Sequence, residues 1–342
     1  MPRQEKLVAR QTKKYQKTKS EYMPNTYNGL INIYKEAGYT SSDVVARLRG
    51  ILHQKKIGHT GTLDPDAVGV LVICLGNGTK LCDMLTDHDK EYIAVCKLGV
   101  ETDTQDISGN VLATSEVNVS KEELHEAVQA FVGDYDQIPP MYSAIKIGGK
   151  KLYELAREGK TVERKPRRIH IDAISILDDS KLLSDGIFTM EVKCSKGTYI
   201  RTLCHDIGQR LGCGATMAHL TRTAVGSFHL EDAVTLDQVE KLRDANLLDS
   251  AIKPTEVLFK DLDFVHIKDE FLPKLKNGNP FKTSDIVDEH LADEQDVVEK
   301  DSEYPDGTRI RVYDNDDNFF GIYAYDGRTR LFKVEKFFYE TK

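Results

Sequence analysis

Asp64 is the residue whose type and setting could most directly do chemistry. It lies in the segment Gly58–Pro65, which reads GHTGTLDP. Two glycines and a proline in this short segment exclude a regular helix or an interior strand, because glycine permits positive φ and proline restricts the residue before it. The apolar run Val68–Leu75 follows and predicts a buried strand. We therefore expect a sharply shaped loop that presents one carboxylate from a rigid scaffold, although a purely structural turn would leave the same pattern.

Three further side chains could complete a site around Asp64, namely Tyr92, Tyr199 and Arg201. An arginine beside an aspartate favours the ionised carboxylate, and its planar guanidinium can hold that carboxylate in one orientation. A tyrosine adds a flat stacking surface and a hydroxyl. An ionised, oriented carboxylate below an aromatic ring is suited to attack on a planar base or a sugar carbon. This chemistry requires no metal and no cofactor, and we expect neither.

Periodic patterns place these residues on defined elements. Glu91–Leu98 alternates and predicts the strand that carries Tyr92. Phe188–Cys194 also alternates, and apolar spacing after it is helical, so Tyr199 and Arg201 lie where a strand passes into a helix. Other predicted helices are 44–53, 120–131 with the capping box Ser120-x-x-Glu123, and 235–248 with the capping box Thr235-x-x-Gln238.

Three other kinds of site are poorly supported by motif order. Gly76–Lys80 reads GNGTK and lacks the G-x-x-x-x-G-K-[ST] order of a phosphate loop. Glu101–Asp106 is acidic but does not fit the calcium-loop template, so we expect a solvated loop. Thr60–Leu63 is similar to the D-K-T-G-T motif of aspartyl-phosphate phosphotransferases. The nucleophile of that motif would fall at Gly58, which excludes this enzyme class.

The totals fit a two-domain protein of the cytoplasm. The chain has 342 residues, more than one comfortable core, and is 40% hydrophobic and 30% charged. Apolar runs fall short of a membrane span, and the polar N-terminus lacks the apolar core of a secretory signal. The six cysteines include no C-x-x-C pair, so they predict small core residues in a reducing compartment.

Charge is segregated along the chain, although the net charge is −8. Residues 1–27 carry seven Lys/Arg against two Glu and predict a disordered basic arm. Residues 141–168 carry nine Lys/Arg against three Glu with interleaved tyrosines, which suits RNA phosphates and unstacked bases. Residues 284–306 carry ten Asp/Glu against one Lys, within a region from about 255 that predicts a small antiparallel β domain. A non-enzymatic RNA-binding protein would explain this charge pattern, but it leaves the residues around Asp64 without a purpose.

Taken together, the motifs resemble those of the bacterial tRNA pseudouridine synthases of the TruB family. GHTGTLDP is followed in order by GNGTK, by KEY at 90–92 and by SKGTYIR at 195–201. The similarity runs from about Gly29 to the end of the chain and includes the basic 141–168 segment and Lys276–Pro280. Several separate motifs in one order are more specific than any single motif.

The resemblance implies a role for each residue of the site. Asp64 would be the nucleophile and Arg201 its ion-pair partner. Tyr92 would stack on the target base and assist proton transfer. The other implied substrate-binding residues are Tyr199 and Leu220 lining a uracil pocket, His59 beside the vacated base position, and Lys80 as a weaker support for Asp64 or a phosphate.

The implied fold is mixed α/β, with a catalytic domain around an antiparallel or mixed sheet and a small C-terminal PUA-like β domain. These domains would span 28–254 and 255–342, and the acidic 284–306 loop would project away from RNA. The implied substrate is uridine 55 in the T loop of tRNA, modified by a monomer without a cofactor, and attack at C6 and at C1′ both stay open. An RNA-binding thumb at about 141–168 would present Lys146, Lys150, Lys151, Arg167 and Arg168.

Overall fold

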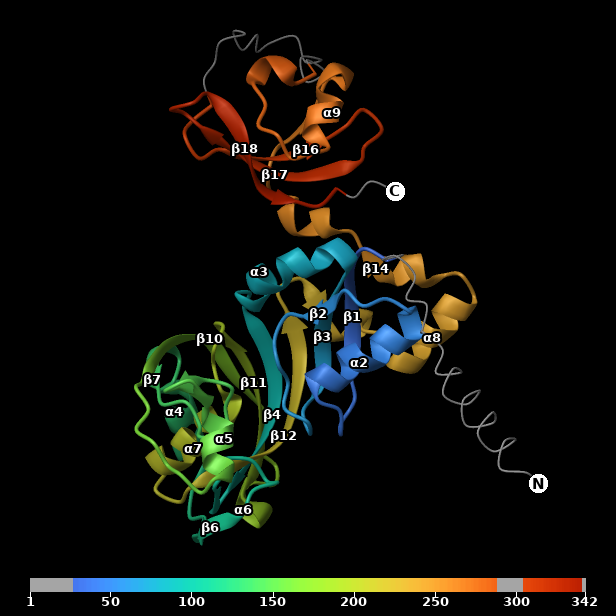
Figure 1. The fold of residues 1–342 in the computed structure, drawn as a ribbon. Helices are drawn as coiled ribbons and strands as arrows, with labels where there is room; N and C mark the ends of the chain where they lie inside the picture. The colour runs from blue at the N-terminus through green and yellow to red at the C-terminus, as the bar shows by residue number, and fades with distance from the viewer. Residues whose placement is uncertain (1–26, 288–303, 340–342) are drawn as a thin grey trace, which may run out of the picture.

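Two β-sheets, one large and one small, organise the chain (Figure 1). The computed structural model describes residues 27–287 and 304–339. The strands of the large sheet are β1 (Gly29–Lys35), β2 (Ile57–His59), β3 (Val68–Leu75), β4 (Lys90–Leu98), β7 (Gly133–Gln137), β10 (Arg167–Asp178), β11 (Ile187–Cys194), β12 (Ala215–Val225), β13 (Phe228–His229) and β14 (Ile252–Lys253). Their order is β14-β1-β3-β12-β4-β11-β10-β7, while β2 and β13 pair with β3 and β12 beside this path.

The burial of β3 and β4 follows their sequences. β3 is buried at every position, as its apolar run predicts, because protein covers both of its faces. β4 alternates between buried and half-buried residues, which directs Tyr92 into the core. Neighbouring strands are antiparallel except β3 and β12, which run parallel where Arg222 lies opposite Gly69.

Helices pack against the large sheet in two groups. α2 (Ser41–Leu52) and α8 (Leu236–Asp244) share a hydrophobic cluster with β1 and β3. α4 (Lys121–Gln129) and α7 (Ile200–Arg210) share another cluster with β4, β10 and β11. The remaining α-helices of the described residues are short: α3 (Cys82–Thr86), α5 (Leu152–Arg157), α6 (Leu182–Asp185) and α9 (Leu272–Leu275).

The predicted helix signals are confirmed, although the observed bounds differ by a few residues, most at the end of α8. Capping boxes at Ser120 and Thr235 open α4 and α8. α8 ends at Asp244 and not near Leu248, because Asn246 takes a φ of 56° and turns the chain out of the helix. The residue before Ile200 is extended, so Tyr199 and Arg201 do lie at a strand-to-helix junction.

The small sheet has the order β15-β16-β17-β18. Its strands are β15 (Phe264–His266), β16 (Arg309–Tyr313), β17 (Phe319–Asp326) and β18 (Leu331–Phe337). The hairpin predicted at Asp326-Gly327 joins β17 to β18. The expectation of a wholly antiparallel sheet is wrong, because β15 pairs with β16 in parallel, as strands joined by a long connection can.

A shared apolar cluster joins the two sheets. Phe259 and Phe338 pack against the faces of β1 and β3 that α2 and α8 leave uncovered. Between the sheets, GNGTK lies in the 3₁₀ helix η1 (Gly76–Leu81), where Asn77 Nδ2 donates to the Phe338 carbonyl at 2.7 Å. This segment is therefore an element of packing, in line with its lack of phosphate-loop order.

The basic segment 141–168 is divided between a short hairpin and the large sheet. Gly148-Gly149 forms the turn of a hairpin between β8 (Lys146–Ile147) and β9 (Lys150–Lys151), and α5 follows, as the sequence indicated. Arg167 and Arg168, however, begin β10 and pair with β7 in the large sheet. The inserted segment therefore ends before Arg167, because these two arginines already belong to a regular ladder. The other two-stranded sheet of the described residues pairs β5 (Val100–Thr102) with β6 (Val111–Thr114).

Residues 1–26 and 288–303 lie outside the described residues, so the basic arm and most of the acidic loop stay predictions. The first part of the predicted loop is packed, since Ile286 pairs with Ile267. Within 27–287 and 304–339, every helix is too short or too polar to cross a membrane.

We predict that Gly69→Ala destabilises the protein by about 2 kcal/mol or more. Gly69 has a φ of 105°, and a Cβ there would lie 2.2 Å from the Arg222 carbonyl oxygen on β12. Urea denaturation gives the measurement. Gly50→Ala on α2 is the control, because a Cβ there meets no atom within 4 Å, and we expect no loss of stability. Equal urea midpoints for Gly69→Ala and the unmodified protein would contradict the close approach of β3 and β12.

Candidate active site

The Asp64 loop is held to the sheet from both ends. β2 pairs with β3, and Thr60 N continues that pairing by donating to Val72 O at 3.1 Å. Leu63 is buried, and its N–H donates to the Ser41 hydroxyl at 2.9 Å. After the turn, Lys35 Nζ donates to Pro65 O at 2.9 Å. The backbone on either side of Asp64 is thus fixed, which confirms the expectation of a shaped loop.

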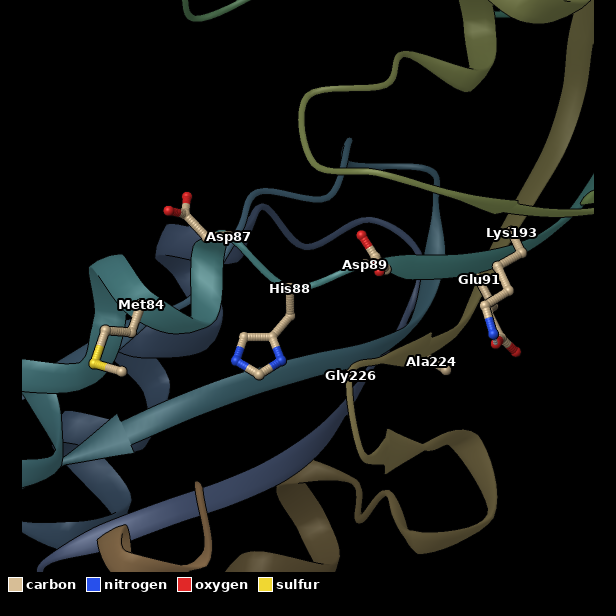
Figure 2. Close-up of a pocket in the computed structure, with 8 residues that line it drawn as sticks. All are labelled: Met84, Asp87, His88, Asp89, Glu91, Lys193, Ala224 and Gly226. Carbon is tan, nitrogen blue, oxygen red and sulfur yellow. Dashed lines mark ion pairs between the residues drawn. The ribbon is translucent and has the colours of Figure 1, made fainter. Parts of the chain in front are cut away.

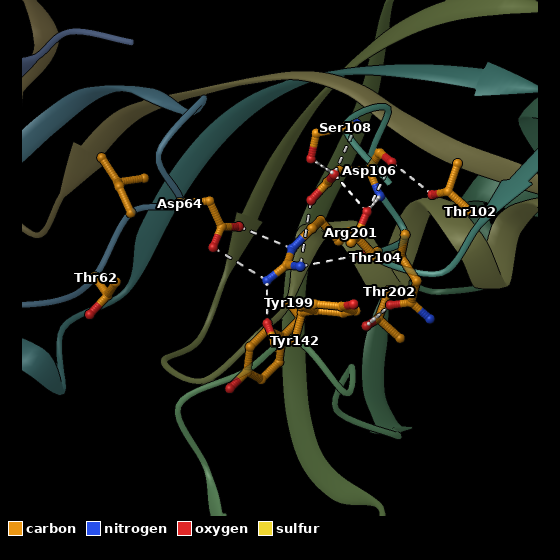
Figure 3. A network of polar contacts seen from close by, with 12 residues as sticks. Thr62, Asp64, Thr102, Thr104, Asp106, Ser108, Tyr142, Tyr199, Arg201 and Thr202 are labelled. Carbon is orange, nitrogen blue, oxygen red and sulfur yellow. Dashed lines mark hydrogen bonds and ion pairs between the residues drawn. The ribbon is translucent and has the colours of Figure 1, made fainter. Parts of the chain in front are cut away.

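Arg201 holds the Asp64 carboxylate through a fork (Figure 3). Its Nε lies 3.0 Å from Asp64 Oδ2, and its Nη2 lies 3.3 Å from Oδ1. The Arg201 side chain is 7% exposed and that of Asp64 is 40% exposed. A buried cation therefore orients a carboxylate that stays open to a ligand.

The remaining donors of Arg201 bind two other loops. Nη1 donates to Thr104 O at 3.1 Å and lies 3.5 Å from Asp106 Oδ2, and Nη2 donates to Tyr142 O at 2.9 Å. Thr202, the next residue of α7, donates to Gln105 Oε1 at 2.7 Å. The acidic segment 101–106 is thus not simply a solvated loop, because Asp106 and Thr104 hold the back of the guanidinium. Sequence spacing gave no signal for this role.

The surroundings of Asp64 raise its pKa above the ordinary value. Partial removal from water is the largest cause, and the nearby Asp106 acts in the same direction. Arg201 and Lys35 lower the pKa, but by less than the loss of water raises it. The expectation that Arg201 favours the ionised form is therefore right for the pair and is outweighed in the whole site.

Tyr92 and Leu220 lie beside the Asp64 loop on neighbouring strands. Both are buried and share one hydrophobic cluster with Leu63. Tyr199 caps α7, where its N–H and C=O bond the side chain of Gln137 at 2.8 and 3.0 Å. Burial raises the pKa of the Tyr199 hydroxyl, and the charge of Arg201 acts in the opposite direction. These predicted pocket residues therefore come together with Asp64 and Arg201.

His59 lies half-buried in the same loop, and its Nδ1 accepts the Gly61 N–H at 3.4 Å. Burial is the main cause that lowers the pKa of this imidazole, and the charge of Arg222 acts in the same direction. We therefore expect the neutral ring to be favoured at the rim of the site. A neutral imidazole can stack against a base without adding a second cation to the pocket.

Lys80 does not support Asp64. Its Nζ donates to Phe337 O at 2.6 Å, so the side chain extends to the small sheet. The lysine near Asp64 is Lys35, which is buried at the end of β1 and donates to three carbonyl oxygens. Loss of water lowers the pKa of Lys35 to about 8. Local sequence does not reveal this role of Lys35, because a lysine that ends an apolar strand carries no sign of a buried contact.

The predicted thumb cations differ in their surroundings. Lys150 pairs with Glu158 at 3.1 Å, and Lys151 lies over the Tyr153 ring at 5.3 Å. Arg168 pairs with both Asp134 and Asp136 of β7, at 3.2 Å each. Charge counting over residues 141–168 could not include these two aspartates, so it overstated the positive charge at Arg168.

A separate depression of about 450 Å³ lies where α3 passes into β4 (Figure 2). Asp87, Asp89 and Glu91 line it, and Lys193 pairs with Glu91 at 3.4 Å. Tyr92 points from β4 into the core and does not line this depression. The Asp64–Arg201 pair also lies outside it, so this depression is not the candidate site.

Comparisons with known proteins agree with the site. Residues 49–200 match the TruB family pseudouridylate synthase N-terminal domain, and residues 201–260 match the tRNA pseudouridylate synthase B C-terminal domain. The tRNA pseudouridine synthase B of Lachnoclostridium phytofermentans is 48% identical over 91% of this chain and 99% of its own length. That of Alkaliphilus oremlandii is 46% identical over 76% of this chain and 85% of its own length.

Solved structures support the predicted fold. A chain in the crystal structure of a Cbf5-Nop10-Gar1 complex superposes with a TM-score of 0.64 and 25% identity, over 94% of this chain and 88% of that one. A chain in an H/ACA RNP bound to a substrate RNA containing 2′-deoxyuridine gives a TM-score of 0.63 at 24% identity, over 94% and 89%. The mixed α/β fold followed by a smaller β-sheet is thereby confirmed.

We predict that the Asp64 carboxyl titrates above the ordinary value of 3.8 and that Arg201→Gln moves its pKa higher still. Arg201 stabilises the charged form of Asp64 and lowers its pKa. Without Arg201, the effect of desolvation, which raises this pKa, is no longer opposed by the nearest cation. Carbon-13 NMR of labelled aspartate carboxyls, assigned with Asp64→Asn, measures both values. Arg210→Gln, at the far end of α7, should leave the pKa unchanged. An unchanged or lower pKa in Arg201→Gln would contradict the pairing.

Proposed function

Because this chain belongs to the TruB family of pseudouridylate synthases, we propose that it converts uridine 55 in the T loop of tRNA to pseudouridine with Asp64 as nucleophile. The reaction is an isomerisation, so substrate and product have the same composition. The observation that carries the assignment of Asp64 is its forked pairing with a buried Arg201, which holds one half-exposed carboxylate in a fixed orientation.

The target uridine must leave its stack to reach this carboxylate, at a cost of a few kcal/mol. A pocket with Leu220 and the rings of Tyr92 and Tyr199 beside Asp64 offsets that cost through apolar contact and stacking. The base of the thumb meets α7 where Arg201 Nη2 donates to Tyr142 O at 2.9 Å. Binding of RNA by the thumb would therefore act directly on the guanidinium that holds Asp64.

The proposed chemistry balances without a co-reactant. The Asp64 carboxylate attacks C6 of the base or C1′ of the sugar, and the bond between N1 and C1′ breaks. The held uracil then rotates, and a bond forms between C5 and C1′. The proton on C5 leaves, N1 gains a proton, and the bond to Asp64 breaks. We assign the reception of the C5 proton to the phenolate of Tyr92, which lies on β4 in one hydrophobic cluster with Leu63 of the loop.

Arg201 would act by orientation more than by charge. A planar fork on both carboxylate oxygens restricts Asp64 to one approach, and Asp106, Thr104 and Tyr142 restrict Arg201 in turn. Asp106 also offsets part of the guanidinium charge. Because Asp106 partly neutralises Arg201, the Asp64 carboxylate can move from the guanidinium to the substrate carbon at a lower electrostatic cost.

RNA contacts outside the pocket would come from the thumb and from the small sheet. We propose that the thumb follows the phosphates of the T stem and that residues 255–342 form a PUA-like RNA-binding domain. The family resemblance and the exposed cations of the thumb support this assignment. A purely RNA-binding protein would need these same surfaces. Only the enzyme needs the Asp64 carboxylate, so substitution of Asp64 distinguishes the two functions.

We predict that Asp64→Asn lowers pseudouridine formation in transcribed tRNA to below about one thousandth, while tRNA binding largely survives. The amide keeps the size of the carboxylate and removes its nucleophilic charge. Asp66→Asn is the matched control, because Asp66 is an exposed aspartate of the same loop, and its turnover should stay near that of the unmodified enzyme. Retained turnover in Asp64→Asn would remove Asp64 from its assigned role and favour the purely binding function.

For the thumb, we predict that Lys146→Ala with Lys150→Ala flattens the salt dependence of tRNA binding. The slope of log affinity against log salt should fall by roughly 0.7 to 0.9 for each lysine that contacts a phosphate. Filter binding or anisotropy over a salt series measures the slope. Lys241→Ala on α8 is the control, and its slope should not change. An unchanged slope in the thumb variant would take these lysines out of the RNA interface.

A further inference from the structure

Arg222 on β12 is the largest fully buried side chain of the described residues, and it lies outside the Asp64–Arg201 network. Its side chain has no ion-pair partner within 4.0 Å among residues 27–287 and 304–339. A buried cation without a carboxylate is costly, so its other contacts must be many and well placed. This cost makes Arg222 a candidate for a role beyond packing.

The Arg222 guanidinium donates to backbone carbonyls on both sides of the Asp64 turn. Nη2 donates to Gly61 O at 3.3 Å and Nη1 to Thr62 O at 3.5 Å, just before Asp64. Nε donates to Val70 O at 2.8 Å, on the strand that follows the loop. One rigid, planar group therefore joins the two ends of the turn that presents the carboxylate.

Arg222 also lies next to Tyr92, the second residue of the proposed chemistry. Arg222 and Tyr92 are direct neighbours across the antiparallel pair of β12 and β4, and the positive charge of Arg222 acts on the Tyr92 hydroxyl. On its other side, the Arg222 backbone approaches Gly69 so closely that no Cβ fits there. Arg222 is thus fixed between β3 and β4, with Asp64 held on one side and Tyr92 on the other.

We propose that Arg222 is a positioning residue that sets the placement of the Asp64 loop relative to the Tyr92 hydroxyl, and thereby the transfer of the C5 proton to Tyr92. This inference rests on the proposed function of Asp64 and Tyr92. Attack by Asp64, at C6 or at C1′, and loss of the C5 proton act on atoms of one nucleoside, so a shift of the loop against Tyr92 spoils the second step even where the first survives.

Electrostatics support the same role. Burial raises the pKa of Tyr92, whereas the positive charge of Arg222 lowers it. The other groups that act on Tyr92 are Cys194 of β11 and Asp64, and both raise its pKa. Arg222 is therefore the group that favours the proton-accepting phenolate. Loss of its charge should shift any alkaline dependence on Tyr92 to higher pH.

The test compares Arg222→Lys and Arg222→Met with the unmodified enzyme in single turnovers of tRNA that carries hydrogen or deuterium at C5 of the target uridine. We expect the rate to fall by about tenfold or more in both variants, with tRNA affinity within about threefold. A primary isotope effect at C5 should appear or grow, because proton loss becomes slower than the other steps. A merely structural role would lower the amount of active protein and leave the isotope effect unchanged.

The two variants distinguish the role of the planar Arg222 guanidinium from the role of its positive charge. Arg222→Lys keeps a cation and should keep the pH profile, whereas Arg222→Met should move the alkaline limb to higher pH. Thermal unfolding and tRNA binding report on the fold, and Arg222→Lys decides the question if Arg222→Met does not fold. Unchanged rate and isotope effect in Arg222→Lys would overturn the inference. Turnover in Asp64→Asn would instead overturn the proposed function, so the two failures are distinguishable.

Discussion

The burial of the Arg201 guanidinium is the constraint on which the site depends. A cation that is 7% exposed needs partners for nearly all of its donors, and these partners come from three separate loops. The thumb base, the turn after β5 and the Asp64 loop must therefore converge on the start of α7. Their convergence positions the carboxylate, and the desolvation that it brings raises the pKa of Asp64.

The large sheet supplies the rigidity behind this arrangement. β3 is buried on both faces and carries the Asp64 loop at its start, so movement of the loop would disturb two hydrophobic clusters. The parallel step between β3 and β12 brings Arg222 under the loop and next to Tyr92. Arg222, a second buried cation, therefore binds the backbone of the turn, while Arg201 binds the Asp64 carboxylate.

Electrostatics divide the molecule into regions with different tasks. Buried cations at Lys35, Arg201 and Arg222 surround the Asp64 loop and bind mainly carbonyl oxygens, which gives geometry without a dense local charge. Exposed cations of the thumb stand where a polyanion can reach them. The net charge of −8 thus says little about RNA binding, because the acidic residues cluster elsewhere in the chain.

The sequence by itself determined the features that neighbouring residues impose on one another. The glycines and proline of Gly58–Pro65, the apolar run of β3 and the capping boxes are local patterns with local steric causes, and each predicted its element. The order of the motifs also sufficed for the family. Only the tertiary structure decided that Thr104, Asp106 and Tyr142 hold Arg201, that Lys80 turns to the small sheet, and that Asp134 and Asp136 pair with Arg168. These contacts join residues far apart in the chain, and strand register and topology bring them together. The periodicity within one segment predicts neither the strand register nor the sheet topology.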